Sequence, residues 1–218
     1  MPKIFYLICG YRGSGKDSLY KWFCRDRTVS FEHSWKRMLF TNIPCEHLID
    51  SNTMEKTVKI GLADSVKRDV LTFLQLPMFN HEAYKDKPLT DIENVLKITI
   101  LPNLNLDKTQ SLRDLYISVG TKHKMTDINY WCEKAHQDTI HDEIVCITDW
   151  RFVHELDYFK ERGTVITVRV FRKDVPIPRV DVESEHSLDE FKTDLVYVPE
   201  TNFEDEKTEF LKLFPQYV

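Results

Sequence analysis

Short, largely apolar runs alternate along this chain with segments of helical spacing, and the alternation predicts an α/β fold. Runs typical of buried strands occur at residues 3–9, 56–62, 143–150, 165–171 and 194–198. Apolar residues recur with helical spacing at residues 16–26, 63–76, 111–119, about 126–140, 152–162 and 204–213. Strands that alternate with helices favour a mostly parallel sheet flanked by helices.

The segment 78–110 does not fit this alternation, because it is charged, contains proline and shows no regular period. A chain of 218 residues suits one domain with a substantial core. We therefore expect a single domain over residues 1–218, in which about 75–142 forms an insertion or a lid and acceptor-binding segment.

Composition argues against a protein that binds duplex nucleic acid, spans a membrane or relies on disulfides. The net charge of −5 argues against a broad basic surface for duplex nucleic acid, and no apolar run has the length of a membrane span. The five cysteines are scattered and include no C-x-x-C pair, which is typical of reduced thiols. We expect a cytoplasmic protein that binds neither duplex nucleic acid nor a membrane.

The run LICGYRGSGKDS, residues 7–18, is close to the phosphate-binding P-loop pattern G-x-x-x-x-G-K-[ST]. Gly10, Gly15 and Lys16 match, a predicted strand precedes the run and a predicted helix follows it. Glycines let the backbone turn its N–H groups toward phosphate oxygens, and the helix adds the positive end of its dipole. Lys16 supplies a cation for the β- and γ-phosphates of a bound nucleotide.

Asp17 stands where the pattern has Ser or Thr. A carboxylate is a good ligand for Mg²⁺, directly or through water, and Ser18 offers a hydroxyl one position later. We therefore predict a working site that binds ATP with Mg²⁺. The residues predicted to contact ATP are Gly10, Arg12, Gly13, Ser14, Gly15, Lys16, Asp17 and Ser18.

Asp149 lies at the end of the predicted strand 143–150. The carboxyl ends of parallel strands face the crevice where ligands bind in such folds, so Asp149 is a second candidate for holding Mg²⁺ or for orienting an acceptor. The alternative is a structural role as the N-cap of the following helix.

Further segments resemble blocks of one known family and occur in its order. They are LADSVKRDVL (62–71), SLRDLYISVGT (111–121), INYWCEK (128–134), residues 146–172 and ESEHSLDEF (183–191). Together with G-x-x-G-S-G-K-D, they resemble the deoxynucleoside monophosphate (dNMP) kinases of bacteriophages and large DNA viruses. Ser65 replaces a proline that is usual in that family, and residues 75–110 match none of its blocks.

This resemblance implies a P-loop NTPase fold of the nucleoside monophosphate kinase-like type. It implies transfer of the γ-phosphoryl group of ATP to a dNMP, with Mg²⁺, and a homodimer as a candidate assembly. It also leans toward a viral origin.

The resemblance also assigns residues to the acceptor. Arg68, with Lys67 beside it, matches the family's K-R pair, and Arg113 matches the arginine before its G-T block. Arginine suits this role because its planar fork binds phosphate in a bidentate manner. The alternatives are a solvated helix face for Lys67 and Arg68 and a surface ion pair for Arg113.

Three more assignments come from the same resemblance. Trp131 is a candidate for stacking on the acceptor base, with core packing as the alternative. Arg151 matches the family's D-x-R and is expected to contact phosphate, while Arg172 is a candidate for lying on the adenine of ATP. The catalytic candidates are therefore Lys16, Asp17, Arg68 and Arg151.

Two other functions stay open. Animal-type phosphomevalonate kinase shares the fold and the aspartate after the P-loop lysine, so a phosphomevalonate kinase-like enzyme is the first alternative. A non-catalytic nucleotide-binding module, in which Asp17 spoils metal binding, is the second.

Overall fold

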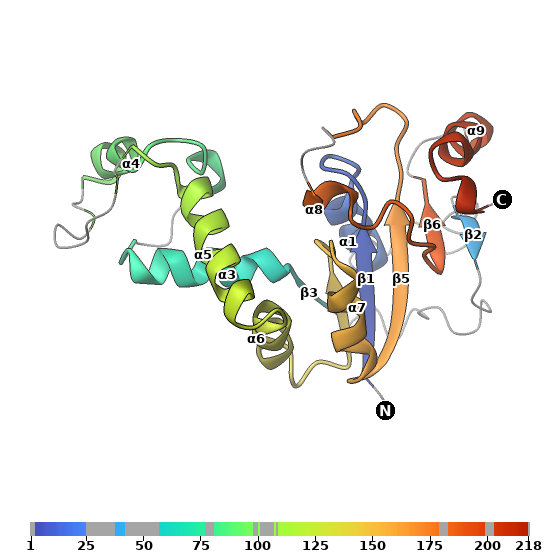
Figure 1. Cartoon of the computed structure of the whole chain (residues 1–218), viewed down its shortest axis with the longest axis horizontal. Coiled ribbons are helices and arrows are strands. Elements are labelled where there is room, and N and C mark those ends of the chain that lie inside the picture. Colours follow the sequence, from blue (N-terminus) through green and yellow to red (C-terminus); the bar gives the residue numbers. More distant parts are fainter. Residues whose placement is uncertain are drawn as a thin grey trace. The chain divides into compact units, whose positions relative to one another are not determined.

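The computed structural model describes residues 3–24, 38–41, 57–76, 81–97, 100, 107, 109–178, 183–198 and 203–217. The chain forms two compact units (Figure 1). The first unit contains Met1–Gly61 and His136–Val218, and the second contains Leu62–Ala135. The prediction of a single kinase domain stays a prediction.

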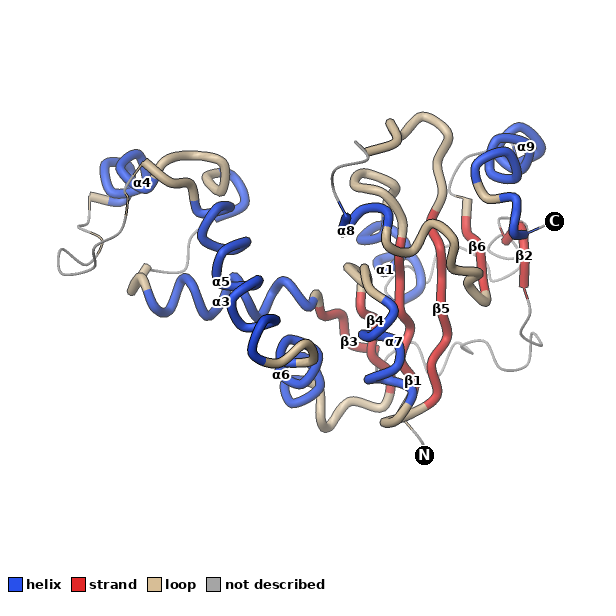
Figure 2. Tube along the Cα trace, viewed as in Figure 1, coloured by secondary structure: helices blue, strands red, loops and turns tan. Residues whose placement is uncertain are grey.

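The first unit is built on a six-stranded sheet (Figure 2). Its strands are β1 (Ile4–Cys9), β2 (Met38–Thr41), β3 (Thr57–Ile60), β4 (Ile144–Ile147), β5 (Thr164–Val170) and β6 (Leu195–Tyr197). They lie in the order β2-β6-β5-β1-β4-β3, and every neighbouring pair is parallel except β2 with β6. The predicted α/β class with a mostly parallel sheet is therefore confirmed.

Helices pack on both faces of this sheet, which explains the apolar runs. On one face, Leu19 of α1 (Lys16–Cys24) packs with Tyr6 and Ile8 of β1. On the other face, the ring of Phe159 in α7 (Val153–Lys160) lies 4.8 Å from that of Phe5. A strand that is covered on both faces must be apolar at consecutive positions, as β1 and β4 are.

The remaining elements of the first unit are short or lie near the C-terminus. They are α8 (Glu183–His186), α9 (Phe203–Leu213) and the 3₁₀ turn η4 (Pro215–Tyr217). Phe210 and Phe214 pack with Val196 and Val198 in a separate apolar cluster.

The second unit consists of helices. They are α3 (Leu62–Phe73), the 3₁₀ turn η3 (His81–Ala83), α4 (Leu89–Leu96), α5 (Leu112–Thr126) and α6 (Tyr130–Asp138), whose last three residues belong to the first unit. Its core joins Val70 of α3, Leu74 just after α3, Leu89 and Ile92 of α4, and Leu112 of α5. The segment 78–110, where no element was assigned, thus contributes η3 and α4.

One element prediction is wrong. The sequence predicted two helices joined by GTKHKM, residues 120–125, but α5 continues through this stretch to Thr126. A glycine weakens a helix by about 1 kcal/mol without ending it, and the packing of α5 on α3 outweighs that cost. The helix ends where Asp127 takes an extended conformation.

In the described part of the chain, no helix combines the length and apolar character that a membrane span requires.

Candidate functional site

The loop from Gly10 to Gly15 connects the carboxyl end of β1 to the first residue of α1. Gly10, Gly13 and Gly15 all have positive φ angles, of 141°, 89° and 97°. A Cβ atom on Gly10 would lie 2.4 Å from the carbonyl oxygen of Val170, so this position also excludes a side chain. The loop is therefore a tight turn that depends on its glycines.

The ammonium group of Lys16 lies against this loop. Its Nζ donates to the carbonyl oxygens of Gly10 at 2.6 Å and of Tyr11 at 2.9 Å. The Oγ of Ser14 is buried and has no hydrogen-bond partner among the described residues. A part-buried ammonium group and a buried, unpaired hydroxyl beside one glycine turn at a helix N-terminus are features that suit an anion.

Asp17 lies in the first turn of α1 and makes two side-chain contacts through its Oδ1. It forms an ion pair with Lys59 of β3, and the Thr148 hydroxyl donates to it at 3.4 Å. Burial raises the pKa of Asp17, but Lys59, Thr148 and Lys16 together outweigh that effect and hold the pKa below its usual value. The carboxylate is therefore ionised at neutral pH.

The carboxylate of Asp17 and the hydroxyl of Thr148 are suitable groups for a Mg²⁺ site. Mg²⁺ prefers oxygen ligands and is commonly held by one or two carboxylates together with substrate phosphates and water. The described residues contain no group of three His, Cys, Asp or Glu side chains that could hold a metal ion by themselves. Asp17, supported by Thr148, is thus suited to a metal that arrives with a nucleotide.

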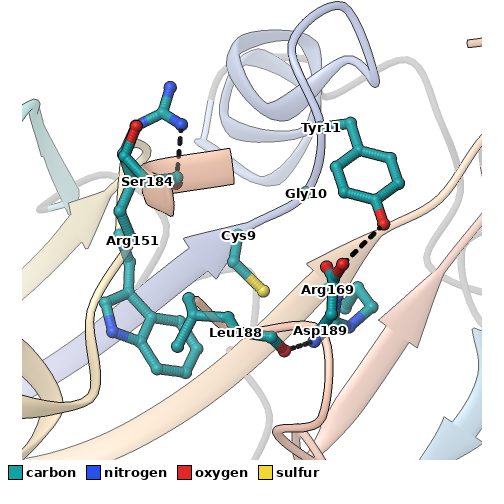
Figure 3. A pocket seen from close by; sticks show the side chains of 9 residues that line it. Cys9, Gly10, Tyr11, Arg151, Arg169, Ser184, Leu188 and Asp189 are labelled. Carbon is teal, nitrogen blue, oxygen red and sulfur yellow. Dashed lines mark hydrogen bonds between the residues drawn. The ribbon is translucent and has the colours of Figure 1, made fainter. Parts of the chain in front are cut away.

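A small pocket opens beside the loop (Figure 3). It has an empty volume of about 270 Å³, part of it open to solvent, and it is lined by Cys9, Gly10, Tyr11, Trp150, Arg151, Arg169, Ser184, Leu188 and Asp189. In Figure 3, the Tyr11 hydroxyl points at the Asp189 carboxylate, to which it donates at 3.1 Å. His186 of α8 contacts the same carboxylate oxygen at 2.7 Å, so the loop is tied to the α8 segment.

Arg169 is the buried cation of this pocket. Its guanidinium group donates to the carbonyl oxygens of Leu188 and, at 3.0 Å, of Phe191, and it lies 4.5 Å from the ring centre of Phe214. Its Nε has no partner among the described residues. Burial raises the pKa of the neighbouring Cys9 thiol, and Arg169 offsets that effect only in part.

Arg151 and Asp149 follow β4 in the first unit. The Arg151 guanidinium donates to the Ser184 carbonyl at 3.1 Å (Figure 3). The cap of α7 is formed by Glu155, whose carboxylate accepts from the backbone N–H groups of Arg151 and Phe152 at 2.9 and 3.1 Å. Asp149 is therefore not the N-cap residue, and its ligand-binding role stays a prediction.

Other candidates for ATP lie around the loop. Arg12 and Ser18 are exposed. Arg172 follows β5 and donates to Asp174 through Nε at 3.0 Å and Nη2 at 2.5 Å. The role of Arg172 in lying on the adenine of ATP stays a prediction.

Four acceptor candidates lie in the second unit, and three of them are charged side chains that make contacts within it. Lys67 pairs with Asp64 at 3.2 Å, and Arg68 donates to the Ser65 hydroxyl at 3.3 Å. Arg113 makes a bidentate ion pair with Asp86. The surface ion pair that was the alternative for Arg113 is thus observed, and its binding of an acceptor stays a prediction.

Trp131, the fourth acceptor candidate, is only 3% exposed. Its indole Nε1 donates to the Gly120 carbonyl at 3.0 Å, and the rings of His123 and Tyr130 meet it edge-on. This burial favours the core-packing alternative. The partly exposed ring of Tyr130, stacked on His123 at 4.3 Å, was not singled out in the sequence.

The first unit thus brings together the glycine loop, Lys16 and Asp17, and it holds Arg151 beside the loop's pocket. Sequence reasoning missed Lys59 and Thr148 beside Asp17, and Asp189 beside Tyr11. Lys59 carried no local signal, because an exposed lysine is common on an edge strand such as β3.

Comparison of the sequence with models of protein families gives no match, and comparison with curated proteins gives no significant match.

Proposed function

We propose that this protein is an ATP-dependent kinase that transfers a phosphoryl group to a deoxynucleoside monophosphate. The fold would be that of a P-loop NTPase of the nucleoside monophosphate kinase-like type. One observation carries the proposal: the ammonium group of Lys16 lies against the three-glycine turn that joins a buried parallel strand to the N-terminus of a helix. The family resemblance of the sequence supports the choice of reaction.

In this proposal, the phosphates of ATP take the place of the loop carbonyls as partners of Lys16. The positive end of the α1 dipole and the backbone N–H groups of the loop would stabilise the phosphate charge. The unpaired hydroxyl of Ser14 supplies a further donor. Lys16 would exchange its two carbonyl partners for phosphate oxygens when the nucleotide binds.

Mg²⁺, when bound, would neutralise charge on the β- and γ-phosphates. Asp17 would hold it, with Asp149 as a second candidate. The Thr148 hydroxyl orients the Asp17 carboxylate by donating to Oδ1.

The reaction would be an in-line displacement at the γ-phosphorus. An oxygen of the acceptor phosphate forms a bond to the γ-phosphorus while the bond to the β,γ-bridging oxygen breaks, and ADP leaves. Such transfer depends mainly on positioning and on charge neutralisation. Arg151, Arg68, Lys67 and Arg113 are the cations proposed to hold the acceptor and the transferred group.

The burial of Trp131 supports a second candidate function, in which the acceptor is a phosphomevalonate-like molecule. Stacking on an aromatic ring is one common way to bind a base, and the indole of Trp131, the ring predicted for this role, is buried in the second unit. A phosphomevalonate-like acceptor needs only cations.

The test is an ADP-release assay with ATP and Mg²⁺. Each deoxynucleoside monophosphate, its ribose counterpart and phosphomevalonate would be supplied one at a time. We expect ADP release with one or more deoxynucleotides. Release with phosphomevalonate alone would move the protein to the alternative branch, and no release with any acceptor would overturn the kinase proposal.

A further inference from the structure

Lys59 is a second lysine near the glycine loop, in addition to Lys16, and it contacts Asp17 in the first turn of α1. It lies on β3 directly beside Cys146 of β4, and Thr148 follows the end of β4. Its Nζ forms the ion pair with Asp17, while Lys16 donates to the loop carbonyls. Among the described residues, Lys59 is therefore the cation in direct contact with the carboxylate proposed to hold Mg²⁺.

We infer that Lys59 is a built-in counter-ion of Asp17 that competes with Mg²⁺ for this carboxylate. The inference rests on the proposed function, because it assigns the metal side of the same site. Lys59 acts through Asp17 and is thus a positioning residue.

The contact has the properties that such a competitor needs. The side chains of Lys59 and Asp17 are 33% and 69% exposed, so solvent weakens their attraction and the pair can open. Both Lys59 and Thr148 use Oδ1. An ammonium group and a doubly charged ion on the same carboxylate repel each other, so each weakens the binding of the other.

The charge balance gives a measurable consequence. Without Mg²⁺, Lys59 neutralises Asp17, which would otherwise repel the phosphates of ATP. Replacing Lys59 with a neutral residue should therefore weaken the binding of metal-free ATP. It should also remove the competitor of Mg²⁺, so the gain in ATP affinity on adding Mg²⁺ should increase.

The experiment is a titration of the full-length protein with a fluorescent N-methylanthraniloyl ATP, once in EDTA and once in Mg²⁺. The quantity compared between variants is the dissociation constant in EDTA divided by the dissociation constant in Mg²⁺. We expect Lys59→Met to raise this ratio roughly fivefold, and Lys59→Arg to leave it near the wild-type value. Lys160→Met, at an exposed position of α7, is the matched control and should leave the ratio unchanged.

Repeating the measurement in an Asp17→Asn variant tests whether the effect of Lys59 acts through Asp17. In Asp17→Asn, where no carboxylate is left to compete for, adding Lys59→Met should not change the ratio. Thermal unfolding would verify that each variant folds, and Lys59→Gln would take the place of Lys59→Met if the latter does not.

Two failures are distinguishable. Absence of nucleotide binding by the wild type in both conditions would overturn the proposed function, and this inference with it. Wild-type binding with an unchanged ratio in Lys59→Met would overturn the inference alone. An equal loss of affinity in EDTA and in Mg²⁺ would do the same, because it would indicate direct contact of Lys59 with phosphate.

Discussion

At the scale of single residues, the loop between β1 and α1 depends on glycine for two separate reasons. Gly10, Gly13 and Gly15 have positive φ angles, which cost a residue with a side chain about 1 kcal/mol or more. Gly10 alone also faces a backbone carbonyl, that of Val170, at a distance that leaves no room for Cβ. The positions are therefore unequal, and Gly13 has a positive φ although the P-loop pattern requires glycine only at Gly10 and Gly15.

Gly10→Ala should destabilise the protein more than Gly13→Ala. The first change adds a backbone clash to the strained φ, and nothing lies within 4 Å of a Cβ on Gly13. We expect roughly 1 kcal/mol for Gly13→Ala and at least roughly 3 kcal/mol for Gly10→Ala, measured by denaturant unfolding. Equal losses would contradict the close approach of Gly10 to Val170.

Lys16→Ala should abolish phosphoryl transfer while the fold survives. The lysine is part-buried and its ammonium group donates to carbonyl oxygens of the loop, so its loss removes the phosphate cation rather than a core side chain. ADP release should fall at least about a hundredfold, with an unchanged circular dichroism spectrum. Lys160→Ala is the control, and full activity in Lys16→Ala would show that the loop is not the phosphate site.

Asp17→Asn should raise the Mg²⁺ concentration needed for half-maximal activity, because an amide is a weaker ligand than a carboxylate. An increase of about tenfold is expected from a titration of activity with Mg²⁺. Asp157→Asn, at an exposed position of α7, should leave the Mg²⁺ dependence unchanged. The same Mg²⁺ dependence in Asp17→Asn would remove Asp17 from the metal site.

Residues of the candidate site could be predicted from the sequence only where they belong to a local motif. Gly10, Gly15 and Lys16 belong to one contiguous pattern. Lys59 meets Asp17 across 42 positions of the chain only because β3 and β1 both flank β4 in the sheet. No local pattern encodes such a meeting, which explains why Lys59 was missed.

At the scale of elements, the predictions were best where burial was complete. β1 and β4 have continuous apolar runs, β5 is buried at its last five positions, and the sequence placed all three. β2, a strand of four residues at a sheet edge, was missed, whereas the equally short edge strand β3 was predicted within residues 56–62. The break predicted at Gly120 failed because tertiary packing on α3 overrides a weak local preference.

The start of α5 offers a prediction on stability and pH. Ser111 donates its backbone N–H to Asp114 at 2.9 Å, and its Oγ accepts from the Asp114 backbone at 3.2 Å, which is a capping box. Ser111→Ala should lower the free energy of unfolding by about 1 kcal/mol. A loss no larger than that of Ser118→Ala, an exposed position within α5, would contradict the cap.

The backbone and hydroxyl of Ser111 hold the pKa of Asp114 below its usual value. A lowered folded-state pKa stabilises the protein above the unfolded-state pKa, and this contribution is lost as the pH falls through the folded-state pKa. The destabilisation caused by Asp114→Asn should therefore be present at pH 7 and shrink as the pH falls below about 4, the ordinary pKa of an aspartate. A pH-independent difference between the unfolding curves would contradict the assignment.

At the scale of the whole molecule, the helical unit interrupts the sheet unit in sequence between β3 and β4. The sequence placed an insertion or lid at about 75–142, whereas the second unit comprises Leu62–Ala135 and so includes α3. Sequence periodicity identifies α3 as a helix but does not tell which unit it packs in. That choice depends on contacts of α3 with α5, which is distant in sequence.

The central claim is that the loop from Gly10 to Asp17 binds the phosphates of ATP. Hydrogen–deuterium exchange of the full chain, with and without ATP and Mg²⁺, tests it most directly, because the loop N–H groups are the proposed phosphate donors. We expect slower exchange in peptides covering residues 8–19 of the wild type, and little change there in Lys16→Ala. Unchanged exchange of this loop at saturating ATP would contradict the claim.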